Sequence, residues 1–346
     1  MSPAAPDTPD PAKPLRSLGF LTIGLFDPSA PAIGHEDTLR LVQFGEDLGF
    51  DSAWLRHRHL QFGISSPMAV LAALSQRTHR IRLGTAVTPL GAENPFRLAE
   101  DLATVDVLSD GRLEPGFSVG VPMNFAAYRH AIYPEGIDDS QLGFERLLRL
   151  RSFLAGEQVS GRTGREGFEE FSGRVEPHSP GLASRLWYGS ASSDSARLSA
   201  ENGFNMLTSS VIAGELSNDF DENQIDRVRT FRAHHPLGTA ARISQGLVVI
   251  PTDSATRDQV QRYRAYVDER NGRVGRPFGP KRMLFAADLL GPSEELADRL
   301  LANPTFHTVD EVAFALPFTF TTSDYEQILR DIAERLAPLL GWSPQA

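Results

Sequence analysis

The sequence predicts an α/β protein, a (β/α)8 barrel with an insertion after the fourth helix. Three observations support this fold class. Residues 80–120 contain a complete βαβ unit, strand and helix patterns alternate along most of the 346 residues, and eight strand segments can be counted. Because a helical crossover returns the chain parallel to the preceding strand, eight such repeats close most economically into a barrel.

The βαβ unit between residues 80 and 120 is the clearest segment. Its first strand has apolar or β-branched residues at every second position from Ile81 to Val87. Asn94 then caps a helix that begins with Pro95, whose fixed φ suits the first turn. After the stop signal Asp110-Gly111, the run 113–119 forms the second strand. The helix has one apolar face, formed by Leu98, Leu102, Val105 and Leu108.

The other elements follow in the same alternation. The polar stretch 208–235 allows no assignment, and residues 156–184, rich in Gly, Pro and charge, are interpreted as an insertion that covers one barrel face and shapes the pocket. Further strands are predicted at 18–25, 51–55, 185–188, 204–207, 243–250 and 309–316. Further helices are predicted around 41–48, over 67–80, over 141–155, up to 202, over 253–271, and from the capping box 323–326 onward.

Length and composition limit the domain organisation and the location. We expect one domain over residues 15–346 with the insertion at about 156–184, although a chain of this size also permits two domains. Residues 1–14 are rich in Pro, Ala and Asp and lack the features of a signal peptide, so they predict a disordered tail. No apolar run reaches the roughly 18 residues of a membrane span. The absence of cysteine excludes disulfides and thiolate ligands, and suits a cytoplasmic protein.

The charge of the chain limits its partners. A net charge of -10 argues against a nucleic-acid partner, which would require a basic face. A phosphate-bearing ligand would therefore have to be held by backbone N–H groups and a few local arginines.

In a barrel of this kind the active site lies at the carboxyl ends of the strands, and two segments there are distinctive. The first is the turn after the fifth strand, directly before a helix. Its free N–H groups, its hydroxyls and the helix dipole suit an anion, although a capping turn without a ligand explains the same residues equally well. The turn consists of Gly189, Ser190, Ala191, Ser192 and Ser193.

The second segment is the ionisable cluster Arg56-His57-Arg58-His59, after the second strand. It can hold an anion or supply an acid or base near neutral pH; the alternative is a solvated surface loop. We expect no metal site, because His57 and His59 are only two residues apart and the sequence places no carboxylate or third histidine beside them.

Four segments in order resemble the bacterial luciferase-like, flavin-dependent monooxygenases. They are 48–54, 82–87, 94–101 and 108–116, and the later segments 190–198 and 310–317 are also similar. The resemblance runs from about residue 18 to residue 342. It implies a TIM-type barrel with an insertion, which agrees with the independent strand count.

The resemblance also implies a cofactor and partners. Members of the family use reduced FMN, supplied by a separate NAD(P)H-dependent flavin reductase; the flavin reacts with O2 to a C4a-peroxide that oxidises a small organic substrate in a dry pocket. A homodimer is expected on the same basis. Side chains that could form the apolar walls of the pocket, or equally belong to the core, are Phe26, Trp54, Met123, Phe125 and Phe318.

Particular segments match the flavin site of the family. The turn 189–193 corresponds to the turn that holds the flavin phosphate. Ala86, Val87 and Thr88 correspond to the segment along the isoalloxazine ring, where a non-proline cis peptide is common, and we place it at Ala86-Val87. Ser118 to Gly120 corresponds to the strand that lines the ring, with Ser118 and Gly120 as the contact residues.

One departure from the family affects the mechanism. Family members commonly carry Glu-His-His after the Trp of the second strand, whereas this chain, aligned from Trp54, has His57, Arg58 and His59. Arg58 stands at the position of the catalytic histidine and cannot act as a base at pH 7. Either His57 or His59 takes that role, the reaction needs no base, or activity has been lost.

Three alternatives therefore remain open beside the monooxygenase. They are a hydride-transferring enzyme that uses a deazaflavin coenzyme, a flavin-binding relative without catalysis, and a structural barrel without a ligand. No motif in the sequence identifies the substrate.

Overall fold

A computed structural model describes residues 15–309 and 311–344 of the chain. The predicted disordered tail, residues 1–14, lies outside the described residues. None of the helices in these ranges combines the length and the apolar character needed to cross a membrane.

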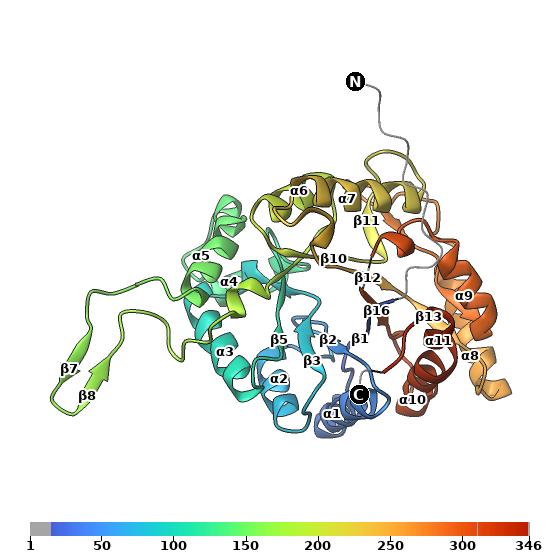
Figure 1. Ribbon diagram of the computed structural model, residues 1–346, viewed down its shortest axis with the longest axis horizontal. Coiled ribbons are helices and arrows are strands. Elements are labelled where there is room, and N and C mark those ends of the chain that lie inside the picture. Colours follow the sequence, from blue (N-terminus) through green and yellow to red (C-terminus); the bar gives the residue numbers. More distant parts are fainter. Residues whose placement is uncertain (1–14, 310, 345–346) are drawn as a thin grey trace.

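The main sheet is entirely parallel and is surrounded by helices (Figure 1). Its strands are β1 (Ser17–Thr22), β2 (Ser52–Leu55), β3 (Arg82–Thr85), β4 (Thr88–Pro89), β5 (Leu113–Glu114), β6 (Gly116–Ser118), β9 (Trp187–Gly189), β10 (Asn205–Thr208), β12 (Ile243–Leu247) and β16 (Glu311–Ala315). The α-helices are α1 (Pro31–Asp47), α2 (Pro67–Ser75), α3 (Pro95–Leu108), α4 (Arg129–Ile132), α5 (Glu145–Leu154), α6 (Ser193–Glu201), α7 (Phe220–His234), α8 (Arg257–Asn271), α9 (Ser293–Leu301), α10 (Thr322–Asp331) and α11 (Ala337–Leu339).

The pairing of the strands closes the sheet. β3 and β4 are two pieces of one strand interrupted after Thr85, and β5 and β6 are two pieces of the next, interrupted at Pro115. β3 pairs with β5 and β4 with β6, while β6 also pairs with β9. The order β5-β3-β2-β1-β16-β12-β10-β9-β6 thus returns to the strand where it began. This confirms the (β/α)8 barrel, with an apolar core that extends over nearly all of its helices and strands.

The repeat that was clearest in the sequence has the predicted capping. Asn94 accepts hydrogen bonds from the backbone N–H groups of Phe96 and Arg97, and Pro95 is the first residue of α3. Buried Leu98, Leu102 and Val105 form the inner face of the helix, as the spacing predicted, but Leu108 is exposed. Leu108 is the last residue of α3, and the chain then turns at Gly111, whose φ is +76°.

The seventh repeat is more elaborate than predicted. The helix predicted over 253–271 is present as α8, but the chain then forms β14 (Met283–Phe285), β15 (Leu289–Gly291) and α9 before it reaches β16. β14 pairs antiparallel with β11 (Val211–Ala213), and β15 pairs parallel with β13 (Val249–Pro251). These two small sheets add a layer beyond the strands of the barrel. The stretch without an assignment contains α7, whose buried face includes polar residues and therefore hides the apolar periodicity.

The predicted role of the insertion is wrong. Residues 156–184 contain the hairpin β7 (Gly164–Glu166) and β8 (Glu169–Phe171), which extends away from the barrel (Figure 1). The insertion follows a helix and precedes a strand, so it leaves the barrel at the amino ends of the strands. Its base is held there by Asp106 near the end of α3, which accepts hydrogen bonds from Ser179 and Arg185. Val175 and Leu182 at this base pack into the core, but the hairpin projects outward and the insertion does not lie at the carboxyl ends, where it would shape a pocket.

A network of four charges fills the amino end of the barrel. The guanidinium of Arg242 lies 2.8 Å from Glu114 and 2.6 Å from Glu311, and that of Arg82 lies 3.1 Å from Glu114. Arg82 also donates to the Ser17 hydroxyl. Although burial alone would raise it, the charges of Arg82 and Arg242 hold the pKa of Glu114 below its ordinary value of 4.5.

We predict that Glu114→Gln destabilises the protein in a pH-dependent manner. Removal of one partner from a largely buried ion network costs about 3 kcal/mol of unfolding free energy at pH 7. Because the folded-state pKa of Glu114 is depressed, its contribution is present above pH 4.5 and is lost as the pH falls through the folded-state value. Denaturant unfolding of both proteins between pH 7 and pH 3 measures the difference.

The matched control for this network is Glu166→Gln on the hairpin. Glu166 forms an exposed ion pair with Arg162, so its loss should change the unfolding free energy by less than about 1 kcal/mol. A deficit in Glu114→Gln that stayed constant down to the lowest pH would contradict the assignment.

Candidate functional site at the carboxyl ends of the strands

The ionisable segment after β2 folds inward instead of lying in solvent. His57 is only 2% exposed. The ring of His59 lies 4.5 Å from that of His57 and 4.7 Å from that of Tyr128, measured between ring centroids. The backbone N–H of Arg58 donates to the carbonyl of Ile64, which fixes the loop. The sequence-based alternative of a solvated surface loop is therefore wrong, because His57 is buried and its ring packs against that of His59 at an interplanar angle of 55°.

Arg56 and Arg58 of the same cluster are half-buried. The guanidinium of Arg56 lies 4.9 Å from the centre of the Phe318 ring. Burial, together with the neighbouring charges of Arg58 and Arg270, lowers the pKa of Arg56 to about 10, so that it remains charged at neutral pH. Two cations thus flank the buried histidines.

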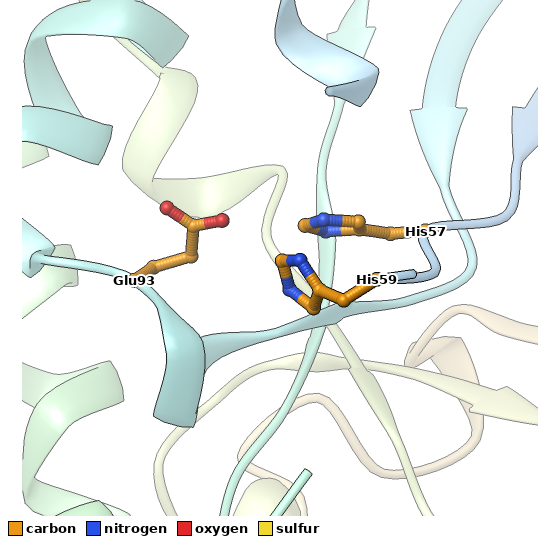
Figure 2. Close-up of side chains that lie close together, drawn as sticks. All are labelled: His57, His59 and Glu93. Carbon is orange, nitrogen blue, oxygen red and sulfur yellow. The ribbon is translucent and has the colours of Figure 1, made fainter. Parts of the chain in front are cut away.

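A carboxylate meets the two histidines. Glu93 follows the short helical turn η1 (Leu90–Ala92) and points toward His57 and His59 (Figure 2). One possible ligand atom from each of the three residues lies within 4.8 Å of the others. Glu93 was missed in the sequence because nothing local connects it with the second strand. Its position directly before the helix cap Asn94, at the carboxyl end of the third strand, is the signal that could have identified it.

Burial controls the protonation of these three residues. It lowers the pKa of His57 to about 4, an effect that His59 and Arg58 reinforce and the Ser65 backbone opposes, and it also lowers the pKa of His59. Burial raises the pKa of Glu93 to about 7, with Asp101 adding to the effect and Arg146 opposing it. Near neutral pH both imidazoles therefore carry free lone pairs, and Glu93 lies near the midpoint of its titration.

The segment between β3 and β4 forms a second part of the site. The Ala86–Val87 peptide bond is cis, as predicted. Ala86 and Val87 pack on an apolar cluster inside the barrel, and Thr88 next to them is fully buried. Thr88 pairs with Phe117, and Pro89 pairs with Ser118, so the predicted segments 86–88 and 118–120 are neighbours. The residues of the apolar cluster are Trp54, Trp187, Leu207 and Ala313, with Leu21 packed against them.

The turn after β9 lies against this second part of the site. A Cβ atom at Gly189 would come within 2.9 Å of the Val87 side chain, so only glycine allows this close approach. Beyond it, Ser192 caps α6 by accepting a hydrogen bond from the N–H of Ser195, and the hydroxyls of Ser190 and Ser195 lie 2.9 Å apart. The structure thus brings together the segments 86–88, 118–120 and 189–193.

The turn already holds an anionic group. The backbone N–H of Ser193 donates to a carboxylate oxygen of Glu215 at 2.7 Å, and the Ser193 hydroxyl donates to Asp226. Glu215 also lies 3.3 Å from Arg227, which is completely buried. Nε and Nη1 of Arg227 have no hydrogen-bond partner within the described part of the chain. A carboxylate on a helix N-terminus beside a buried guanidinium shows that this donor set suits an oxyanion such as a phosphate.

Of the five apolar residues proposed as pocket walls, two lie at the site. Trp54 belongs to the apolar cluster beneath Ala86, and Phe318 lies beside Arg56. Phe125 lies one residue further out, where it packs in the cluster that contains Tyr128, the neighbour of His59. Phe26 faces Phe62, and Met123 is exposed.

Comparison with known proteins agrees with this arrangement. The profile of the luciferase-like monooxygenases matches residues 18–307. The chain is 36% identical over 132 residues to limonene 1,2-monooxygenase of Rhodococcus erythropolis, covering 37% of this chain and 33% of the relative. It is 32% identical over 141 residues to F420-dependent glucose-6-phosphate dehydrogenase of Amycolatopsis mediterranei, covering 39% and 40%. The matched segments thus span only about a third to two fifths of these curated relatives.

A solved structure shares the fold over almost the whole chain. It is the FMN complex of the oxygenating constituent of 3,6-diketocamphane monooxygenase of Pseudomonas putida, with a TM-score of 0.67 and 15% identity. The similarity covers 94% of this chain and 98% of that chain.

We predict that Glu215 competes with anions for the turn. Glu215→Ala frees the N–H of Ser193 and removes the carboxylate that lies 3.3 Å from Arg227, while Asp226 stays. The affinity for inorganic phosphate should therefore rise about tenfold, which corresponds to one charge-assisted hydrogen bond. Isothermal titration with phosphate measures the change.

Glu201→Ala is the matched control for Glu215→Ala. Glu201 lies on α6 and pairs with the exposed Arg197, so its loss changes the net charge equally without touching the turn. Equal gains in phosphate affinity in both variants would show that only the overall charge matters.

Proposed function

Because the chain belongs to the luciferase-like monooxygenase family, we propose that it is a flavin-dependent monooxygenase that uses reduced FMN and O2 to oxidise a small organic substrate. One observation carries the proposal. The oxyanion-binding turn 189–193 lies directly against the Ala86–Val87 segment, through the close approach of Gly189 to Val87. A turn that holds a carboxylate and an apolar platform thus adjoin each other, and this arrangement supports a site for a flavin mononucleotide.

Residues of the turn, the platform and the neighbouring strand would bind FMN in this proposal. The N–H of Ser193, the hydroxyls of Ser190 and Ser192, and the guanidinium of Arg227 would hold the phosphate once Glu215 is displaced. Ala86 to Thr88, with Ser118 and Gly120, would lie along the ring. Bound FMN supplies the activation of oxygen, and it would reach the site from a separate NAD(P)H-dependent flavin reductase.

The remaining side chains exclude water and handle protons. The cluster around Trp54 and Trp187 forms an apolar floor beneath Ala86 and Val87, which limits access of water from the barrel interior. Among the three residues proposed for catalysis, only His57 and His59 can accept a proton at neutral pH, since burial lowers the pKa of both imidazoles and leaves them uncharged. The rings of these two histidines are in contact, with their centroids 4.5 Å apart. Arg58 adds a fixed positive charge nearby.

A second candidate is hydride transfer with a deazaflavin coenzyme such as F420. The similarity to an F420-dependent dehydrogenase favours it, as does the replacement of the family's usual histidine by Arg58. Such a coenzyme would use the same turn and platform. A flavin-binding relative without catalysis is the third reading. A homodimer, inferred from the family, fits each of the three.

Anaerobic binding experiments distinguish these functions. We would titrate the protein with reduced FMN, oxidised FMN and reduced F420, then admit O2 and measure H2O2 release and product formation over a panel of aldehydes, ketones and terpenes. Tight binding of reduced FMN with low H2O2 release and an oxygenated product supports the monooxygenase. Preference for F420 moves the chain to hydride transfer. Flavin binding without turnover indicates the non-catalytic relative, and no binding of either coenzyme contradicts the proposal.

We predict that Ser193→Pro weakens the binding of FMN but not of riboflavin. Ser193 is the first helical residue of α6, where proline fits well, so the change removes one N–H and leaves the helix intact. The preceding Ser192 has φ -138° and ψ 160°, an extended conformation that proline accepts. The loss of a charge-assisted hydrogen bond should raise the Kd for reduced FMN at least about tenfold.

The matched control is Ser193→Ala, which keeps the backbone N–H and should bind FMN nearly as well as the original protein. Fluorescence titration with FMN and riboflavin measures both variants. A proline variant that lost affinity for both ligands alike would place the phosphate elsewhere.

A further inference from the structure

His57, His59 and Glu93 lie close enough together to bind a ligand of their own, independently of flavin. Three ligand atoms, two imidazole nitrogens and one carboxylate oxygen, lie within 4.8 Å of one another (Figure 2). We propose that these residues bind a divalent transition-metal ion of the zinc class. Such a site differs from the expectation drawn from the sequence, which placed no carboxylate near the two histidines.

Unpartnered nitrogens provide the main support for the metal site. Neither Nδ1 nor Nε2 of His57 makes a hydrogen bond of standard geometry in the described part of the chain, although the Ser65 backbone lies close enough to affect the ring, and His57 is 2% exposed. Nε2 of His59 is likewise buried and unpartnered among those residues. More than about nine in ten buried polar groups in proteins are hydrogen-bonded, so three free nitrogens beside a carboxylate indicate a missing partner. A metal ion accepts lone pairs from all three residues at once.

The ligand set is one that transition metals prefer. Two histidines and a carboxylate hold zinc in hydrolytic enzymes and ferrous iron in oxygenases, with at least one coordination position left open. Metal–ligand bonds of about 2.0–2.2 Å require ligand atoms roughly 3.4 Å apart in a tetrahedron, so ligand atoms that lie up to 4.8 Å apart must converge by up to about 1.4 Å. The open position would suit a water molecule or a carbonyl or hydroxyl oxygen of a substrate.

The surrounding charges permit a cation without strongly attracting it. Negative charge near the site comes from Glu93 and from Asp101, which lies on α3. Positive charge comes from Arg58 and from Arg146, which lies on α5. Arg146 is engaged elsewhere, because its guanidinium donates to the Glu93 carbonyl and the Tyr133 hydroxyl. Binding must therefore depend on the three ligands themselves, which makes the proposal sensitive to single substitutions.

The site would also join two parts of the fold. His57 and His59 belong to the loop after β2, whereas Glu93 lies between η1 and α3. A bound ion would link these segments at the entrance to the Ala86–Thr88 platform. Metal binding should therefore raise the melting temperature of the protein whether or not flavin is present.

The test is metal binding to protein that has been stripped with a chelator. Zn2+ and Co2+ are titrated separately by calorimetry, and the visible absorbance of Co2+ reports its coordination. We expect one ion per chain, a Co2+ spectrum of four or five ligands, and a higher melting temperature with either ion. The variants His57→Ala, His59→Ala and Glu93→Gln should each weaken binding at least tenfold, whereas His130→Ala, at an exposed histidine of α4, should bind normally.

Other results would overturn the metal site. No ion bound at a one-to-one ratio would indicate that an ordered water molecule satisfies the histidines. Binding that persists in all three variants would place the ion on other residues. If the histidine variants fail to fold, Cu2+ bound to the unmodified protein provides an independent measurement, because its electron paramagnetic resonance spectrum must show two coordinating imidazoles. A spectrum with fewer imidazoles contradicts the proposal.

Discussion

Four charged side chains at the amino end of the barrel hold together strands that are not neighbours in the sheet. Arg82 and Glu114 come from β3 and β5, while Arg242 directly precedes β12 and Glu311 begins β16. Because β1 and β2 separate the two groups in the sheet, the contacts must cross the barrel interior. They fix the cross-section of the barrel at its amino end, and every layer above it depends on that dimension.

An apolar layer follows directly above the charges. Trp54 and Trp187 meet edge to face with their ring centroids 5.5 Å apart, and the guanidinium of Arg242 lies 4.7 Å from the centre of the Trp187 ring. Room for the Trp54 indole comes from Gly84 on the adjacent strand, where a Cβ atom would approach it to 2.4 Å. From the amino end to the carboxyl end, the barrel interior thus consists of an ionic layer, an aromatic layer and a layer of polar groups. The ionisable side chains of the candidate site lie in the last of these layers.

Local patterns in the sequence predicted the elements that local chemistry determines. The Asn94 cap, the Pro95 start and the turn before α6 were all predictable, as was the family. The convergence of Glu93 with His57, and of Glu215 with Ser193, was not, because each contact joins the loops after two adjacent strands, and no local pattern shows which loop side chains will meet. α7 was missed for a different reason: its buried face includes Gln224 and Arg227, whose polar side chains conceal the helical period.

The hairpin β7–β8 lies far from the candidate site, so a change in the hairpin need not affect the site. Phe168 at its tip is completely exposed, and the hairpin extends away from the barrel (Figure 1). It belongs to a helix-to-strand connection at the amino ends of the strands, whereas the histidines follow β2 at the carboxyl ends. A fluorophore, an affinity tag or a surface linker attached there would leave the reactive end open to solvent and to its ligands. The same separation means that shortening the hairpin alters the outline of the molecule without altering the spacing of the groups that carry out its chemistry.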